Sequence, residues 1–181
     1  MKKLILVVIA ICGFTVATAQ EMKLGIKGGL NLCTLVGSDE SRMLVGANLG
    51  GFVEIKTSEK LSFQPELLVS IQGARTDGYT KQLKYLYIPL MTKYKITENF
   101  NIQAGPQIGL LTSAKYNNYE VKDRYNSFDF GVNLGVGYEL SENMFLEARY
   151  CKGLTQTQKD LYPGDIATKN QVIQFSVGYI F

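Results

Sequence analysis

One segment of the sequence alternates strictly between bulky apolar residues and small or polar ones. Every second residue from position 128 to 140 is bulky and apolar, namely Phe128, Phe130, Val132, Leu134, Val136, Tyr138 and Leu140. The intervening positions hold only Asp, Gly, Asn or Glu. Successive side chains of a β-strand point to opposite faces, so this period of two predicts a strand with one apolar face. The alternation alone suits a soluble sandwich as well as a membrane barrel.

Seven further segments show the same alternation, which makes eight predicted strands in all. They cover residues 22–32, 43–55, 61–71, 86–94, 100–110, 144–150 and 173–181. Several span 11 residues or more, longer than the 5–6 residues typical of globular sheets and long enough to cross a bilayer at a tilt. Beyond the first 19 residues there is no apolar run of the length that a membrane helix needs.

The links between these segments alternate between short and long. Short polar turns are expected at 56–60, 97–99 and 141–143, and longer links at about 33–42, 73–82, 112–126 and 153–170. Outer-membrane barrels have short periplasmic turns and longer external loops. We therefore predict an all-β fold, an eight-stranded antiparallel transmembrane up-and-down β-barrel, in the outer membrane of a Gram-negative bacterium. The short-turn end is called periplasmic below and the long-link end external.

The first residues have the features of a secretory signal peptide. Lys2 and Lys3 precede an apolar run from position 4 to 16, and an A-x-A pattern ends at Ala19. We expect cleavage between Ala19 and Gln20, leaving residues 20–181 as the barrel domain; the alternative is an N-terminal membrane anchor. Without the two leader lysines the 19 basic residues become 17, against 16 acidic ones, which offers no electrostatic case for nucleic acid.

Three prolines fall inside predicted strands, at positions 65, 89 and 106. Proline has no N–H to donate to the ladder, so it is unfavourable in a central strand. We expect bulges or water-satisfied carbonyl groups near these positions.

Four motifs resemble the bacterial outer membrane β-barrel domain family, whose members are often labelled porin-family or PorT-family proteins. They are Leu61-Ser-Phe-Gln-Pro-Glu-Leu-Leu68, Tyr87-Ile-Pro-Leu-Met-Thr-Lys-Tyr94, Ala104-Gly-Pro-Gln-Ile-Gly-Leu-Leu111 and Leu146-Glu-Ala-Arg-Tyr150. The resemblance covers about residues 22–181 and includes the three prolines. It implies the barrel fold, outer-membrane lipid around it and a possible role in protein secretion. It implies no catalytic residues. The chain ends in Tyr179-Ile-Phe181, which resembles the aromatic signal read by the barrel-assembly machinery; an ordinary interfacial aromatic is the other interpretation of Phe181.

Charged residues lie on the face that would line the barrel interior. They are Lys27, Glu54, Glu66, Lys93, Asp129, Glu139, Glu147 and Arg149. An eight-stranded barrel is just wide enough for side chains to fill it, so we expect a network of ion pairs rather than an ion path or paired catalytic acids. The sequence has no histidine, which removes His-dependent triads and most catalytic zinc sites, and we expect no cofactor, metal or enzymatic activity.

Two features of the predicted external end could carry function. Tyr116, Tyr119 and Tyr125 cluster in the third long link, where they suit contact with sugar or protein surfaces or, alternatively, anchor the barrel at the membrane interface. Cys33 and Cys151 share the inward face near this end, and the sequence leaves their pairing open. The leading hypothesis is a monomeric, non-enzymatic barrel that acts through external loops or stiffens the envelope. A narrow porin-like channel and an accessory part of a secretion complex are the alternatives.

Overall fold

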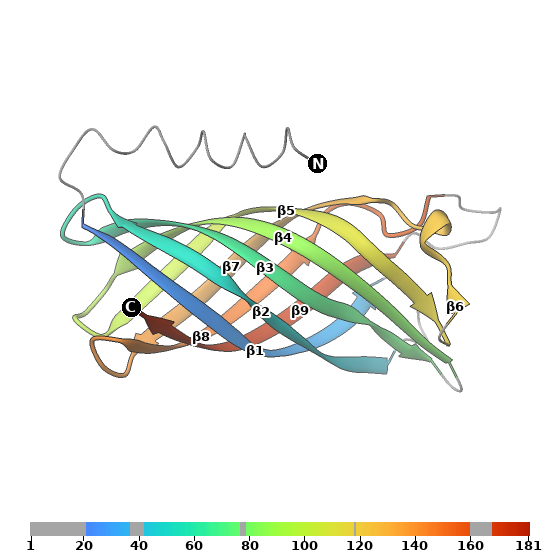
Figure 1. The fold of residues 1–181 in the computed structure, drawn as a ribbon, viewed down its shortest axis with the longest axis horizontal. Coiled ribbons are helices and arrows are strands. Elements are labelled where there is room, and N and C mark those ends of the chain that lie inside the picture. Colours follow the sequence, from blue (N-terminus) through green and yellow to red (C-terminus); the bar gives the residue numbers. More distant parts are fainter. Residues whose placement is uncertain (1–20, 37–41, 77–78, 118, 160–167) are drawn as a thin grey trace.

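Eight long strands close into one barrel. The computed structural model describes residues 21–36, 42–76, 79–117, 119–159 and 168–181, so the predicted leader and its cleavage site at Ala19 and Gln20 lie outside the described residues. The strands are β1 (Met22–Val36), β2 (Arg42–Lys56), β3 (Leu61–Thr76), β4 (Tyr79–Lys95), β5 (Phe100–Tyr116), β7 (Phe128–Glu139), β8 (Met144–Gly153) and β9 (Lys169–Ile180). A two-residue strand, β6 (Tyr119–Glu120), and a single turn of 3-10 helix, η1 (Lys122–Arg124), lie between β5 and β7. Figure 1 shows the barrel from the side.

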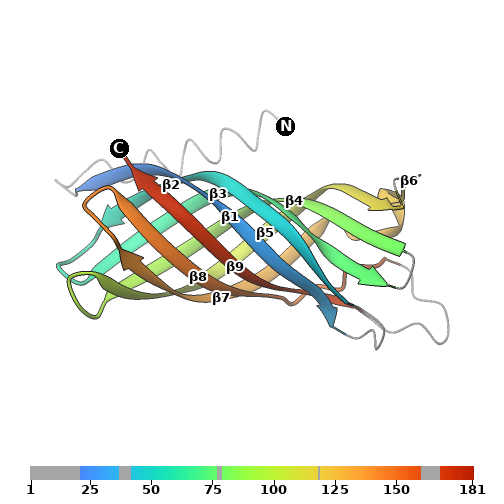
Figure 2. The same ribbon diagram turned by 90° about the horizontal axis from the view of Figure 1, so that it is seen from below.

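Every neighbouring pair of barrel strands is antiparallel, and the β4–β5 and β1–β9 pairings close the sheet. Following paired residues once around the barrel from Met22 returns to β1 at Leu32, ten residues further along the strand. This stagger tilts the strands against the barrel axis, as closed barrels require, and the tilt is plain in Figure 2. The eight-stranded antiparallel barrel is confirmed.

The barrel is apolar outside and polar inside. The apolar positions of β7 face outward, with Leu134 64% exposed, whereas Asp129 and Asn133 on the same strand are buried. The same inversion holds in β1, where Leu24, Ile26 and Leu30 are exposed. A soluble sandwich buries its apolar face, so this arrangement decides between the two folds that the alternation allowed. In the part of the chain that the structure describes, no helix is long and apolar enough to cross a membrane.

The prediction of the second long link was wrong. It was placed at 73–82, but β3 continues to Thr76 and β4 starts at Tyr79, so a hairpin of paired strand residues occupies most of it. Together with β5, these strands extend the external end of the barrel (Figure 1).

The prolines interrupt the ladder without shifting it. Pairing in β3–β4 stops after Pro65 and resumes at Leu68 in the same register. The register shifts lie elsewhere, between Met43 and Asn48 in β2–β3 and between Lys84 and Tyr85 in β4–β5. The expectation of bulges at the prolines was therefore wrong. A missing N–H removes one bond of the ladder, but it does not oblige the strand to gain a residue.

Candidate functional site: the barrel interior and the external platform

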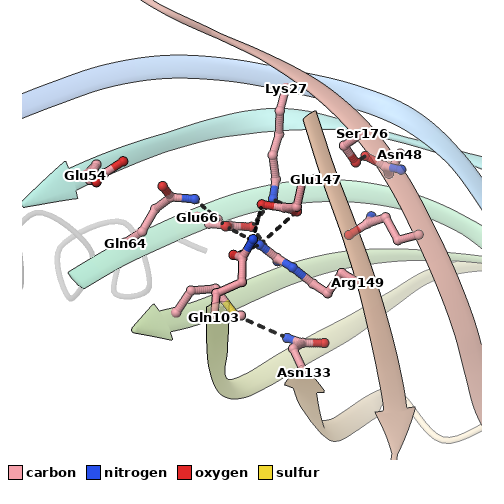
Figure 3. Close-up of polar contacts among 12 residues, drawn as sticks. Lys27, Asn48, Glu54, Gln64, Glu66, Gln103, Asn133, Glu147, Arg149 and Ser176 are labelled. Atoms are coloured by element: carbon pink, nitrogen blue, oxygen red, sulfur yellow. Dashed lines mark hydrogen bonds and ion pairs between the residues drawn. The ribbon is translucent and has the colours of Figure 1, made fainter. Parts of the chain in front are cut away.

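Four charged side chains meet at the centre of the barrel interior (Figure 3). Lys27 Nζ on β1 lies 2.9 Å from Glu66 Oε2 on β3 and 2.8 Å from Glu147 Oε1 on β8. Arg149 on β8 binds both oxygens of Glu66, at 3.0 and 2.9 Å, and its Nη2 lies 2.9 Å from Glu147 Oε1. All four side chains are at most 1% exposed. Two positive and two negative charges thus neutralise one another where water cannot do so.

Two glutamines complete this cluster. Gln103 on β5 donates to Glu147 Oε2 at 3.0 Å and accepts from Arg149 Nη2 at 3.0 Å, and Gln64 donates to Glu66 Oε1 at 2.7 Å. We call the six residues the central cluster. Charges buried without partners are costly, and these hydrogen bonds fill the carboxylate lone pairs that the cations leave free. The central cluster joins β1, β3, β5 and β8 across the interior.

A second polar group lies beside the central cluster on β1, β2, β3 and β9. Asn31 Nδ2 donates to Ser70 Oγ at 2.9 Å, and Asn48 Nδ2 donates to Asn31 Oδ1 at 2.9 Å. Ser176 Oγ donates to Asn48 Oδ1 at 3.1 Å. Hydrogen bonds between neutral side chains therefore occupy the part of the interior that the charged side chains do not reach.

Aromatic rings close the periplasmic half of the interior. Phe52 and Phe145 pack edge to face, with ring centroids 5.5 Å apart, and each lies directly across a strand pair from a glycine, Gly25 and Gly178 respectively. A Cβ on Gly25 would lie 2.3 Å from the ring of Phe52, and one on Gly178 would lie 2.0 Å from the ring of Phe145. The missing side chains are what give the rings room to lie across the interior.

Lys93 and Glu54 lie next to these rings. Lys93 Nζ is 3.1 Å from Glu54 Oε2 and 5.0 Å from the centroid of Phe145. The ammonium group is therefore held by a carboxylate and by the faces of aromatic rings, both of which favour a cation.

A tyrosine cluster closes the external half. Tyr85 and Tyr87 stack with centroids 5.2 Å apart, and Tyr87 lies over Gly109, its partner across β4–β5. Tyr87 Oη donates to Asp129 Oδ2 at 2.5 Å, and Asn170 Nδ2 donates to the same oxygen at 3.4 Å. Asp129 was expected to pair with a cation, but among the described residues its partners are these two neutral donors. Hydrogen bonds can satisfy a buried carboxylate in place of a counter-ion.

The linker between β5 and β7 folds back into the mouth of the barrel. Tyr125 is only 6% exposed and packs in the buried cluster of Leu68, Leu83, Tyr85, Tyr87, Leu111 and Ala114. Burial raises the pKa of Tyr125, with the charge of Tyr116 adding to the effect and that of Arg124 opposing it. The prediction of Tyr125 as an exposed contact residue was wrong, because its ring packs in this buried cluster.

The described parts of the third and fourth external links contact each other, and we call them the external platform (residues 119–127 and 154–159). Tyr125 pairs with Gln158 in an isolated β-bridge, and Asn126 Nδ2 donates to the carbonyl oxygens of Gln156 and Gln158 at 2.8 and 3.2 Å. β6 pairs with the end of β5, which places Tyr116 opposite Tyr119. Tyr116 is half-buried, whereas Tyr119 is 78% exposed.

The remaining predicted residues lie apart from the central cluster. Glu139 pairs with Lys95 at 3.4 Å, and both are partly exposed at the periplasmic end. Phe181 is exposed and packs edge to face on Tyr179 at 5.7 Å. Within the described residues there is no group of His, Cys, Asp and Glu side chains fit to hold a metal ion.

Cys33 and Cys151, the two cysteines among the described residues, are buried and unbridged. Cys33 and Cys151 are each paired with Val172, so one strand, β9, lies between them. Neighbouring strands are about 4.8 Å apart, and two such steps exceed the Cα separation of about 7 Å beyond which a disulfide needs backbone movement. The geometry therefore favours two free thiols.

The sequence reasoning did not identify Gln64 and Gln103 as members of the central cluster, nor the pairing of rings with glycines. Both sets occupy positions whose side chains point inward, so the alternating pattern could have predicted that they lie in the interior. Only the register of neighbouring strands shows which of them meet.

The comparisons with known proteins agree with this geometry. A family model described as "Outer membrane protein beta-barrel domain" matches residues 18–159. Among solved structures, the Neisserial surface protein A is similar with a TM-score of 0.59 at 12% identity, over 87% of this chain and 97% of that one. Ail, the attachment invasion locus protein of Yersinia pestis, and a major outer membrane protein of Thermus thermophilus each give a TM-score of 0.55 at 15% identity. Each match covers 89% of this chain and, respectively, 99% and 100% of the other. At these identities the likeness concerns the fold. No curated protein matches the chain.

Proposed function

Since the chain belongs to the outer membrane protein β-barrel domain family, we propose that it is a non-enzymatic barrel that does not conduct solutes and acts through its external platform. On this proposal the leader directs export, the barrel-assembly machinery inserts the chain, and the mature protein stands as a monomer in outer-membrane lipid. The interior stabilises the barrel, and contact with other molecules takes place outside the membrane.

The observation that carries the proposal is that buried side chains lie across the interior at three levels. The rings of Phe52 and Phe145 lie in the periplasmic half, the central cluster in the middle, and the tyrosine cluster in the external half. An ion on its way through would have to displace a neutralised cluster and two layers of aromatic rings. A narrow channel, the alternative function, needs a continuous polar path instead.

Single-channel recording on the purified, refolded protein tests this closure. We expect no steady conductance from the wild type in a planar bilayer. The variants Glu66→Ala and Arg149→Ala, which remove mass and charge from the central cluster, should give at most brief openings. Steady wild-type conductance that either substitution abolishes would establish a channel and overturn the proposal.

Hydrogen bonding within the external platform supports a contact role. Asn126 joins its two segments and Tyr119 is paired with Tyr116, and a preorganised surface loses less entropy when it binds. The structurally similar Ail is named the attachment invasion locus protein. An attachment role through external loops is the kind of function that we propose here.

Photo-crosslinking in intact cells tests the site of contact. A benzoylphenylalanine placed at Tyr119 should form adducts with a molecule outside the barrel, because that side chain is the most exposed tyrosine of the platform. The same residue at Asn143, in the turn between β7 and β8, is the matched control at the periplasmic end. Discrete adducts at position 143 with none at 119 would favour a periplasmic partner, such as a secretion complex, over the external role.

A further inference from the structure

Two lysines face outward near the external ends of β8 and β9. Lys152 is exposed beside Cys151, which is buried on the inward side, and Lys169 is exposed beside the buried Asn170. Lys152 pairs with Gln171, two residues along β9 from Lys169. The two lysines are thus diagonal neighbours on one face of an antiparallel pair, with Cα atoms about 7–8 Å apart.

Polar side chains of neutral character surround this pair. Thr34 on β1 is opposite Gln171, whose amide group is hydrogen-bonded to the hydroxyl of Tyr150. Neither lysine has an ion pair with any residue that the structure describes. Among the described outward positions in the external halves of β1, β7, β8 and β9, none is acidic.

The lysine pair borders directly on the lipid-facing surface. On β7 the residue opposite Lys152 is Val132, which is exposed, and Phe130 follows it toward the external end. On β9 the outward residue that follows Gln171 is Ile173, also exposed. A lipid whose chains lie on Val132 and Ile173 would therefore bring its head group to the two ammonium groups.

Two lysines at the periplasmic end of the barrel, in contrast, have ion-pair partners. Lys56 pairs with Glu21 at 3.3 Å, and Lys95 pairs with Glu139 at 3.4 Å. Lys56 and Lys95 thus have carboxylate partners within the protein, whereas Lys152 and Lys169 have no such partner among the described residues.

We propose that Lys152 and Lys169, with Gln171 and Thr34, bind the phosphate of a lipid head group in the external leaflet. A phosphate offers several strong acceptor oxygens, which suit two ammonium groups, an amide and a hydroxyl. The flexible stems of the lysines can lie along the apolar surface while their charged ends reach the head-group layer. The site selects anionic lipid from the lipids that surround the barrel.

Electron paramagnetic resonance of spin-labelled lipids tests this proposal on the intact mature barrel. The protein is reconstituted in phosphatidylcholine vesicles that carry a trace of spin-labelled phosphatidic acid or spin-labelled phosphatidylcholine. For wild type we expect phosphatidic acid to associate at least about fivefold more strongly than phosphatidylcholine, because one lysine contact with anionic lipid contributes about 1 kcal/mol and the site has two lysines.

Two matched variants decide the outcome. Lys152→Gln/Lys169→Gln should bring the preference close to one, whereas Lys56→Gln/Lys95→Gln removes the same charge at the periplasmic end and should keep it. All four side chains are at least partly exposed, so folding should survive, and the heat-dependent electrophoretic shift of a folded barrel verifies it. An unchanged preference in the first variant, or an equal loss in the second, would overturn the proposed site.

Discussion

Replacement of Arg149 by Met tests whether the central cluster holds the barrel together. Arg149 makes two bonds to Glu66, one ionic contact with Glu147 and one hydrogen bond to Gln103. Without its guanidinium, two fully buried carboxylates would share the single charge of Lys27. Removing one partner of a buried ion pair costs about 3–5 kcal/mol, because an uncompensated charge is left behind. We expect the free energy of unfolding to fall by about that amount.

Urea titration in lipid vesicles, followed by far-ultraviolet circular dichroism, measures this loss. The chain has no tryptophan, so a strand signal is preferable to indole fluorescence. Lys95→Met is the matched control, because its ion pair with Glu139 is partly exposed and such pairs contribute about 0–1 kcal/mol. If both variants lost equal stability, the argument from burial would be refuted.

A double variant shows whether charge or packing is responsible. Glu66→Gln/Arg149→Met leaves Lys27 facing Glu147 alone, at 2.8 Å, so the central cluster is neutral again. Residues of one buried network couple by about 0.5–3 kcal/mol. We expect the double variant to be more stable than the sum of the two single losses predicts. Strict additivity would mean that the lost packing of the side chains, rather than charge balance, dominates.

Three further predictions concern the interior, the lipid face and the thiols. Gly178→Ala should destabilise the barrel by about 1–3 kcal/mol, the range for overpacking. Gly51→Ala should have a small effect, because its added Cβ would meet only a carbonyl oxygen at 3.5 Å. Urea titration compares the two variants, and equal losses of stability would contradict the role of the ring over Gly178. Leu134→Lys places a charge on the lipid-facing surface, so it should lower the free energy of unfolding by about 2–4 kcal/mol and reduce the folded fraction after refolding. Complete refolding of this variant would contradict the assignment of Leu134 to the lipid-facing surface. Cys33 and Cys151 should react with maleimide only after unfolding, equally with and without prior reduction, and a reductant-dependent difference would reveal a disulfide.

Alternation predicted the fold because the barrel imposes one rule on every strand. Outward positions meet lipid and inward positions meet other side chains. The direction in which Val132 or Asn133 points can therefore be predicted from its own strand alone, even when the neighbouring strands are not known. The same parity placed Lys27, Glu66, Glu147 and Arg149 inside. Four residues on three strands then meet because the register brings them to one level, and the sequence of a single strand holds no information on register.

The external end was predicted less well, because its side chains follow no such rule. The hairpin of β3 and β4 continues through a segment that looked like a loop, since backbone pairing needs no apolar alternation once the strands leave the membrane. The sequence does not distinguish Tyr125 from Tyr119, yet one ring packs in the buried cluster of Leu83, Tyr85 and Leu111 and the other is exposed. Only the tertiary fold distinguishes them.

The polar interior explains how the strands can pair in a single register even though one apolar residue on the outer surface can replace another. Lipid solvates any apolar side chain, so the outward residues do little to choose one strand pairing over another. A slip of one residue would turn Glu66 or Arg149 out into lipid and separate Phe145 from the space over Gly178. The ion pairs and the ring–glycine pairs therefore favour one register over the others. Side chains that fix the register in this way occupy the interior, which supports the proposal that the protein acts through its outer surfaces.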